Sequence, residues 1–149
     1  ILEDFRFTGA VPYRPFHQPM FLFYVNWLWT ARWNGTVAMS YKFLRERLKT
    51  FHQARLDRRH GMPVRDAGWH FSQTGGWQNV YDRLQSDYRR AFQKSSAFGN
   101  PNVLKENIPQ GKYIGTEKKC VVVPLDETFP KYLIDNQEKF KHLIGGPLK

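Results

Sequence analysis

The sequence predicts an α/β fold, a mixed layer of few strands and three main helices. Stretches dense in aromatic and β-branched residues, which favour strands, alternate with stretches of apolar residues at helical spacing. The order of these stretches fits an α/β or α+β layer, although it supplies too few strands for a complete nucleotide-binding sheet. The chain shows no internal repeat and no low-complexity tract.

The size and composition favour one folded unit. The chain has 149 residues, and at this length folding buries roughly two-thirds of the surface of the unfolded chain. Its hydrophobic share of 41% and aromatic share of 16% exceed those of a disordered protein. We therefore expect residues 1–149 to form a single domain or part of a larger one.

The first third of the chain predicts an irregular start followed by strands. One glycine and three prolines make residues 1–19 irregular or a short edge segment. The run PMFLFYVNWLWTA, residues 19–31, is typical of a buried strand or strand pair and is about half as long as a membrane-spanning helix. Residues 32–35 predict a turn, and TVAMSY after it predicts a second short strand.

Residues 41–60 predict the first helix. Leu44, Leu48 and Phe51 fall on one helical face, and basic residues occupy much of the remainder. The glycine and proline of GMP then end the helix. Residues 64–72 predict a short strand that enters a glycine turn.

The second half of the chain predicts two more helices. Residues 77–94 carry an apolar stripe, which is more typical of core packing than of ligand binding. Residues 95–115 are rich in Ser, Gly, Asn and Pro, with a single helical turn in VLKENI, and CVVVPL predicts a strand. Residues 128–144 predict the third helix, with Pro130 in its first turn and an Asp135–Lys139 pair. Its inward-facing residues are Leu133, Phe140, Leu143 and Ile144.

The charge distribution indicates an anionic partner or a solvated basic helix face. The formal net charge is +10, and residues 41–60 contain seven Lys or Arg against Glu46 and Asp57. Nucleic acid, acidic lipid and the diphosphate of a sugar nucleotide would all be attracted by such a surface. Charge alone does not decide between these partners and simple solvation.

The chain carries neither a recognisable signal peptide nor a run long enough to cross a membrane, so its compartment stays open. The single cysteine, Cys120, excludes an internal disulfide and a Cys-rich zinc site. The apolar neighbours of Cys120 in KKCVVVP favour a buried structural thiol over a nucleophile.

The stretch DAGWHFS, residues 66–72, is the strongest candidate for a functional site. It has two interpretations: a packed strand end with a hydrogen-bonded structural histidine, or the floor of a binding site. Gly75 and Gly76 follow it, and we expect their N–H groups to face an anion at the start of the next helix. His70 would supply a metal or phosphate ligand there, and Trp69 an aromatic platform.

Three stretches resemble glycosyltransferase family 17, the family of the bisecting β-1,4-mannosyl-glycoprotein N-acetylglucosaminyltransferase and its bacterial and viral relatives. The first block, residues 21–45, contains FLFYVNW and RWNGTVAMSYKFLR. The second block, residues 67–86, contains AGWHFS, the glycine pair and a helix that ends in LQS. The third block, FPKYLIDNQEKFKHLIGGP, covers residues 129–147. Three blocks in the same order are harder to obtain by chance than any one of them.

The resemblance implies an inverting transferase of GT-A-like fold that moves N-acetylglucosamine from a UDP donor to a mannose-containing glycan. Such folds usually hold the diphosphate through a divalent metal, Mn or Mg, on an Asp-x-Asp motif. This sequence contains no Asp-x-Asp motif. We therefore expect an incomplete domain, the acceptor-side C-terminal portion of such an enzyme, which cannot bind the metal by itself.

The resemblance also assigns roles to individual residues. His70 would contact the metal or the diphosphate, and Asp66 or Asp87 would be the catalytic base. Relatives place a His and a Glu where this chain has Arg89 and Ala91, and Arg89 could still neutralise phosphate charge. The residues expected to bind substrate are Trp69, Ser72, Gly75, Gly76, Trp77 and Arg89.

Two other functions compete with this one. The missing Asp-x-Asp motif and the net charge of +10 also fit a noncatalytic derivative of the fold that binds RNA or docks in a large assembly. A DNA-binding module is disfavoured, since the basic helix has no helix-turn-helix partner and no zinc-finger signature is present.

Overall fold

The computed structural model describes residues 13–86, 100–113 and 116–148. Its strands are β1 (Tyr13–Leu22), β2 (Trp27–Met39), β3 (His70–Ser72) and β4 (Val121–Val122). Its α-helices are α1 (Tyr41–Phe43), α2 (Phe51–Leu56), α3 (Gly76–Ser86), α5 (Pro101–Asn107), α6 (Lys131–Asp135) and α7 (Gln137–Phe140). Within the described residues there are also a π-helical turn, η1 (Leu44–Leu48), and the 3₁₀ turns η2 (Asp57–Arg59), η4 (Ile108–Gln110) and η5 (Lys141–Leu143). The predicted mixture of helices and strands is confirmed.

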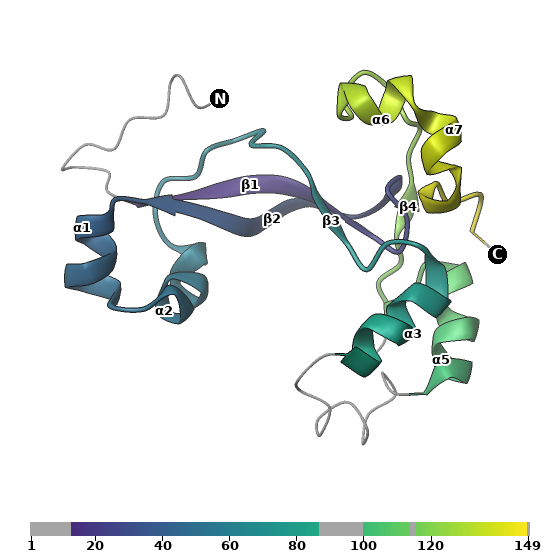
Figure 1. Cartoon of the computed structure of the whole chain (residues 1–149), viewed down its shortest axis with the longest axis horizontal. Coiled ribbons are helices and arrows are strands. Elements are labelled where there is room, and N and C mark those ends of the chain that lie inside the picture. Colours follow the sequence, from purple (N-terminus) through teal and green to yellow (C-terminus); the bar gives the residue numbers. More distant parts are fainter. Residues whose placement is uncertain (1–12, 87–99, 114–115, 149) are drawn as a thin grey trace. The chain divides into compact units, whose positions relative to one another are not determined.

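The strands form one sheet in the order β3-β1-β2-β4 (Figure 1). Residues 23–26 alone join β1 to β2, and a connection this short permits only antiparallel pairing. β4 also pairs antiparallel with β2, with Trp27 opposite Val122 and Leu28 opposite Val121. The aromatic run of residues 19–31 is therefore a strand pair around a turn.

Two predictions for the first strands are wrong. β1 begins at Tyr13, contains two prolines and lies between β3 and β2, whereas the sequence predicts an irregular stretch or a short edge segment there. The strand tolerates Pro15, which has no N–H, because the pairing with Val64 requires only its carbonyl. That carbonyl accepts a hydrogen bond from the N–H of Val64 at 2.8 Å. β2 likewise runs through the predicted turn at residues 32–35, and Gly35 lies within the strand.

The chain divides into two compact units, each with a part of β1 and of β2. Unit 1 comprises Ile1–Pro19 and Ala31–His70, and unit 2 comprises Met20–Thr30 and Phe71–Lys149. The helical elements of unit 1 are α1, η1, α2 and η2. In unit 1 the hydroxyl of Tyr13 donates to the carbonyl of Ala54 at 3.3 Å, which fastens α2 to the start of β1.

The single helix predicted for residues 41–60 is split in the structure. Lys49 has a φ of 64°, a left-handed value that ends the first helical segment. The Thr50 hydroxyl then accepts a hydrogen bond from the N–H of Gln53 at 3.1 Å and begins α2 as its N-cap. As a result Phe51, predicted to face the core, is 80% exposed.

The strand predicted for residues 64–72 is also interrupted. Val64 makes a parallel bridge to Phe16, and regular pairing resumes only at β3. Between them Asp66 has a φ of 50° and Gly68 a φ of 92°, conformations that a strand does not accommodate. The carbonyl of Ala67 accepts from Gln18 Nε2 at 3.0 Å and its N–H donates to the carbonyl of His17 at 3.2 Å, so both a side chain and the backbone of β1 hold this bent segment.

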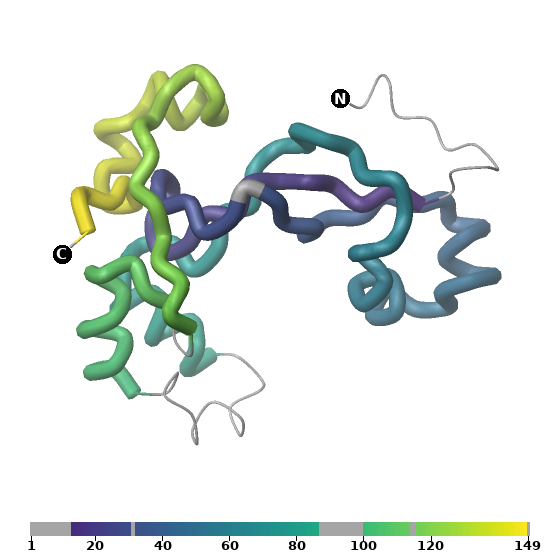
Figure 2. Tube along the Cα trace, turned by 180° about the vertical axis from the view of Figure 1, so that it is seen from behind, coloured from purple at the N-terminus to yellow at the C-terminus, as the bar shows by residue number. Residues whose placement is uncertain are grey.

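Unit 2 contains two groups of buried apolar residues. The first consists of Leu22, Phe23, Trp27, Val80, Leu104, Ile108 and Cys120. The second consists of Phe21, Val25, Phe129 and Leu133. α3 packs against α5, as Figures 1 and 2 both show, and the two helices contribute Val80 and Leu104 to the first group. The helix predicted for residues 77–94 is described as α3 up to Ser86, and the remainder lies outside the described residues.

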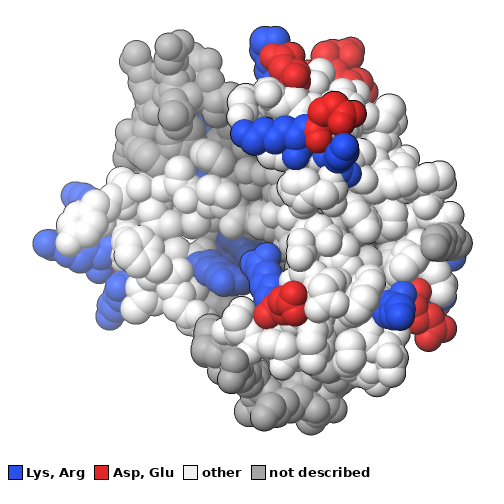
Figure 3. All heavy atoms as spheres, turned by 45° about the vertical axis from the view of Figure 1, so that its right-hand side comes forward, with Lys and Arg blue, Asp and Glu red and all other residues white. Residues whose placement is uncertain are grey.

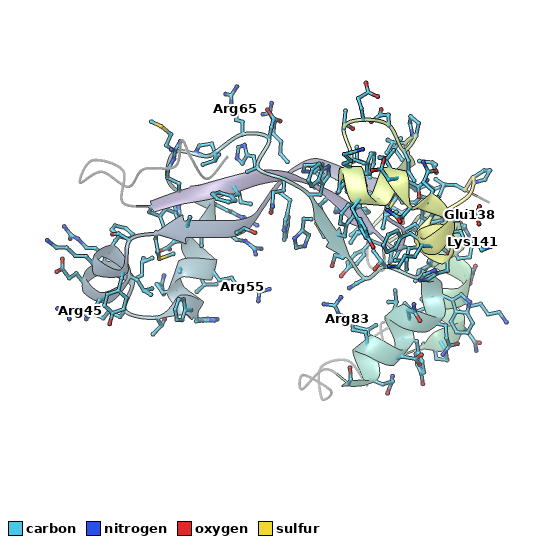
Figure 4. The ribbon with its side chains drawn as sticks, turned by 45° about the horizontal axis from the view of Figure 1, so that its top comes forward. Arg45, Arg55, Arg65, Arg83, Glu138 and Lys141 are labelled. Carbon is cyan, nitrogen blue, oxygen red and sulfur yellow. The ribbon has the colours of Figure 1, made fainter. Side chains whose placement is uncertain are left out.

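The third predicted helix is broken at Asn136, whose φ of −127° and ψ of 36° separate α6 from α7. The predicted Asp135–Lys139 pair is therefore wrong, because its members no longer lie on one continuous helix. Asp135 instead pairs with Lys131 at 2.8 Å, and Lys141 with Glu138 at 3.4 Å (Figure 4). The predicted inward face is confirmed, since Leu133 is buried with Phe140, Leu143 and Ile144 packed around it. Among the described residues, no helix is long and apolar enough to cross a bilayer.

Candidate functional site

The turn between β1 and β2, residues 23–26, is the point in unit 2 where distant segments meet. The carbonyl oxygen of Phe23 accepts hydrogen bonds from Gly75 N–H at 2.8 Å and Gly76 N–H at 3.2 Å. The N–H of Phe23 donates to the carbonyl of Ser72 at 3.3 Å. The expectation that the glycine pair offers its N–H groups to an anion is therefore wrong, because Phe23 already occupies them.

The glycine pair is required by the geometry of this contact. Gly75 has a φ of 98° and Gly76 a φ of 77°, both in the left-handed region that other residues enter at a cost. A Cβ atom at Gly76 would also lie 2.8 Å from the hydroxyl oxygen of Tyr24. The pair therefore brings the start of α3 against the turn, a structural role that fully accounts for two glycines in succession.

The C-terminal segment reaches the same turn from another direction. Asn26 donates from Nδ2 to the carbonyl of Gly145 at 2.9 Å and accepts at Oδ1 from the N–H of Gly145 at 2.7 Å. The indole N–H of Trp27 donates to the carbonyl of Gly146 at 3.1 Å, and Val25 N–H to the carbonyl of Leu143 at 2.9 Å. Residues 23–27 therefore hold two segments of the chain in place: the stretch that leads into α3 and the C-terminal segment.

His70 lies in unit 1 in a cluster with Trp33, Gly35 and Arg58, which we call the Arg58 cluster. The His70 and Trp33 rings have centroids 5.9 Å apart, and the guanidinium carbon of Arg58 lies 4.5 Å from the Trp33 centroid. A Cβ atom at Gly35 would lie 2.7 Å from Trp33 Nε1 and 3.0 Å from His70 Nδ1. Glycine at position 35 therefore lets the indole and the imidazole approach the strand.

Burial and charge both disfavour a proton on His70. Desolvation lowers the pKa of His70, and the positive charge of Arg58 lowers that pKa further. Desolvation also lowers the pKa of Arg58, as do the neighbouring Arg55 and Arg59. Tyr13 acts in the opposite direction and raises the pKa of Arg58. The cluster therefore combines a neutral imidazole with a guanidinium that has two other arginines near it.

Trp33 Nε1 is buried and has no hydrogen-bond partner. A buried donor left unpaired costs about 1–3 kcal/mol, and such groups are uncommon in folded proteins. The cluster thus contains one buried N–H donor without an acceptor.

The remaining predicted residues divide between the two units. Asp66 and Trp69 belong to unit 1, where Asp66 is exposed and Trp69 is 39% exposed. Ser72, Gly75, Gly76 and Trp77 belong to unit 2, and Trp77 packs against the first buried group with Lys105 Nζ 5.8 Å from its ring. Asp87 and Arg89 lie outside the described residues.

Three members of the Arg58 cluster are not among the site residues that the sequence predicts. Trp33 and Gly35 both lie in RWNGT, where a glycine two residues after a tryptophan predicts a turn. Arg58 is one of seven basic residues in residues 41–60, and nothing in the sequence distinguishes it from the others. Only its stacking on Trp33 does so.

His70 has poor surroundings for a divalent metal ion. No group of three His, Cys, Asp or Glu side chains that could hold a metal occurs within residues 13–86, 100–113 and 116–148. The charged side chain nearest to His70 in the cluster is the cation Arg58, which repels a second cation. The residues present at His70 therefore do not fit the metal that the family resemblance implies.

The chain matches no family model, no curated protein and no solved structure. A functional conclusion therefore depends on which residues the fold brings together. Two places are informative: the turn at residues 23–26 in unit 2 and the Arg58 cluster in unit 1.

Proposed function

We propose that this chain is the acceptor-side portion of a family 17-like glycosyltransferase of GT-A-like fold. The reaction is transfer of N-acetylglucosamine from a UDP donor to a mannose-containing glycan. The observation that supports it is the convergence of the three resembling blocks on the turn at residues 23–26. Phe23 of the first block bonds Gly75 and Gly76 of the second, and Asn26 bonds Gly145 of the third.

This convergence matters because chance similarities have no reason to meet in space. The blocks are separated by long stretches of sequence, yet their polar contacts are made by the residues that carry the resemblance: the Asn of FLFYVNW, the glycine pair and the terminal IGGP. A second contact of this kind occurs in unit 1, where Trp33 and Gly35 of W-x-G-T lie against His70 of GWHFS. Both contacts are what a shared ancestral fold would preserve.

Trp69 and Asp66 are the residues we assign to the acceptor. The partly exposed indole of Trp69 offers an apolar face against which the C–H groups of a pyranose ring can stack. Asp66 acts as the base: it takes the proton of the acceptor hydroxyl while that oxygen bonds to C1 of N-acetylglucosamine. The bond from C1 to the phosphate oxygen breaks, and UDP leaves with the electron pair.

Glycan binding tests the acceptor assignment directly. Titration with a mannotriose core should give saturable binding, and a galactose trisaccharide should bind more weakly. Trp69→Ala should weaken mannotriose binding by about tenfold, since it removes a stacking surface. Phe51→Ala is the matched control, because Phe51 is an exposed aromatic residue of the same unit and should leave binding unchanged. Equal binding of both sugars, or equal effects of both variants, would contradict the proposal.

Turnover tests the role of Asp66. In assays of the full-length parent protein with UDP-N-acetylglucosamine and the mannose-containing acceptor, Asp66→Asn should lower the rate by about 10²–10⁴-fold, the usual loss when a general base is removed. Asn tolerates the positive φ of Asp66 as well as Asp does, so the backbone should be preserved. Mannotriose affinity should be unchanged in this variant. A rate equal to that of the wild type would remove Asp66 from the mechanism.

The exposed basic surface of unit 1 supports a second candidate, a noncatalytic subunit that binds RNA or another polyanion. Lys42, Arg45, Arg47, Lys49 and Arg55 are all exposed. Figure 3 shows blue side chains gathered at the left without red ones beside them, whereas at the upper right the two colours are mixed. This function predicts RNA binding whose affinity falls steeply with salt as counterions are released, together with no turnover. Absence of RNA binding at low salt would eliminate it.

A further inference from the structure

The guanidinium of Arg58 is held in place by an aromatic ring. Arg58 lies on η2, and its guanidinium carbon sits 4.5 Å from the centroid of Trp33. A guanidinium over the face of an indole is attracted to the ring electrostatically, and its N–H groups can still donate hydrogen bonds. Arg58 is therefore better ordered for recognition than a basic side chain that extends freely into solvent.

Arg58 lacks a neutralising carboxylate in the described part of the chain. The ion pairs found there, Lys131–Asp135 and Lys141–Glu138, involve neither Arg58 nor its neighbours. The adjacent carboxylate of Asp57 instead accepts a hydrogen bond from Gln53 Nε2 at 3.2 Å. Arg55 and Arg59 act electrostatically on Arg58 in the direction that disfavours its charge. An anion beside Arg58 would relieve this repulsion.

The imidazole of His70 adds hydrogen-bonding capacity to the cluster. Its ring centroid lies 5.9 Å from that of Trp33, and a neutral imidazole carries one N–H donor, whereas the indole N–H of Trp33 is enclosed by the protein. A site with a guanidinium over an aromatic ring, an imidazole N–H and no competing carboxylate matches the acceptor-rich oxygens of a phosphate group.

We infer that Arg58, Trp33 and His70 form a binding site for a diphosphate, in which Arg58 supplies the positive charge. The choice of a sugar nucleotide as the source of the diphosphate rests on the proposed function. Arg58 would then neutralise the charge that develops on the departing UDP, the task that a metal ion performs in relatives with an Asp-x-Asp motif. This assigns Arg58 to the leaving group and gives His70 an anion, in place of a metal, as its neighbour.

Binding of inorganic pyrophosphate to the chain tests the site without requiring turnover. Calorimetric titration in a metal-free buffer containing a chelator should show saturable binding. Arg58→Gln should weaken this binding about tenfold or more, the loss expected for one or two charge-assisted hydrogen bonds. Arg45→Gln, the same change at an exposed arginine of η1 on the same unit, should leave the affinity unchanged (Figure 4). Arg58→Lys, which keeps the charge, should lose less than Arg58→Gln.

The indole N–H signals provide a second measurement. The chain has five tryptophans, and the signal of Trp33 can be assigned from its disappearance in Trp33→Phe. Pyrophosphate should shift the Trp33 signal selectively in the wild type and leave it in place in Arg58→Gln. Circular dichroism of each variant establishes that the chain remains folded.

Competition by UDP compounds and comparison with mannotriose binding distinguish failure of the diphosphate site from failure of the proposed transferase function. UDP and UDP-N-acetylglucosamine should compete with pyrophosphate if the source is a sugar nucleotide, whereas selective pyrophosphate binding would indicate a free diphosphate. Pyrophosphate binding that depends on Arg58 without mannotriose binding would support the site and contradict the transferase. Mannotriose binding without pyrophosphate binding would do the reverse. Absence of pyrophosphate binding, or equal loss in the Arg58 and Arg45 variants, would overturn the inference.

Discussion

Asn26 and Gly145 form a reciprocal pair of hydrogen bonds, although 119 positions separate them in the sequence. The carboxamide of Asn26 donates to the carbonyl and accepts from the N–H of the same glycine, as a neighbouring strand would. Asn26 is only 5% exposed, so water cannot replace either bond. The side chain thus fastens the C-terminal segment to the first turn of the sheet.

Truncation of Asn26 should therefore be strongly destabilising. Asn26→Ala leaves two buried backbone groups of Gly145 unpaired, and we expect the free energy of unfolding to fall by about 2–5 kcal/mol. Asn102→Ala, at an exposed position of α5, should change it by less than about 0.5 kcal/mol. Urea denaturation measures both variants, and similar midpoints for the two would show that the reciprocal pair contributes little.

The two consecutive glycines at positions 145 and 146 should respond differently to the same substitution. A Cβ atom at Gly145 would collide with the indole of Trp27, whereas nothing lies within 4 Å of a Cβ atom at Gly146. We expect Gly145→Ala to lower the free energy of unfolding by about 1–3 kcal/mol through overpacking. Gly146→Ala should stay within about 0.5 kcal/mol of the wild type. Both changes stiffen the unfolded chain alike, so equal stabilities would exclude the collision with Trp27.

The fold was predictable where local sequence determines structure. Aromatic density identified the strand pair around residues 23–26, and helical spacing identified the buried face of the C-terminal segment. The split at Lys49 was missed because apolar periodicity continues through it. The signal that could have revealed it is Thr50 followed three residues later by Gln53, the pattern of an N-terminal helix cap.

The candidate site was predictable only in part, because its contacts are long-range. DAGWHFS singled out His70, but Trp33 lies on a different strand and Arg58 on a separate turn. The glycine pair before a helix predicts an anion site, since a helix start with free N–H groups favours anions. The structure shows Phe23 as the acceptor of those groups, and no sequence pattern could specify a carbonyl 52 residues away from Gly75.

The lowered pKa of His70 predicts that acid weakens the fold. In the unfolded chain His70 binds a proton near its ordinary pKa of about 6.5, whereas desolvation and Arg58 keep it neutral to lower pH when folded. The unfolded state therefore binds more protons as the pH falls below about 6.5, and stability decreases toward the folded pKa. Urea midpoints at about pH 7.5 and about pH 5.5 should show this loss, and His70→Asn should reduce it.

The matched control for this measurement is His142→Asn, at an exposed position of unit 2. It should keep the full pH dependence of the wild type, because it leaves His70 and Arg58 intact. A His70→Asn variant with the same pH dependence as the wild type would show that protonation of His70 is not coupled to folding.

Cys120 should be chemically inert in the folded protein. The side chain is 2% exposed within the first buried group of unit 2, and its backbone N–H donates to the carbonyl of Gly111 at 2.8 Å. Burial raises the pKa of the thiol to about 11, although Lys118 opposes this shift slightly. The thiolate is the reactive species. Iodoacetamide at about pH 8 should therefore label the native chain about 100-fold more slowly than the urea-unfolded chain. Mass spectrometry of the two time courses makes the comparison on the same residue, and rapid stoichiometric labelling of the native chain would mean that this core opens readily.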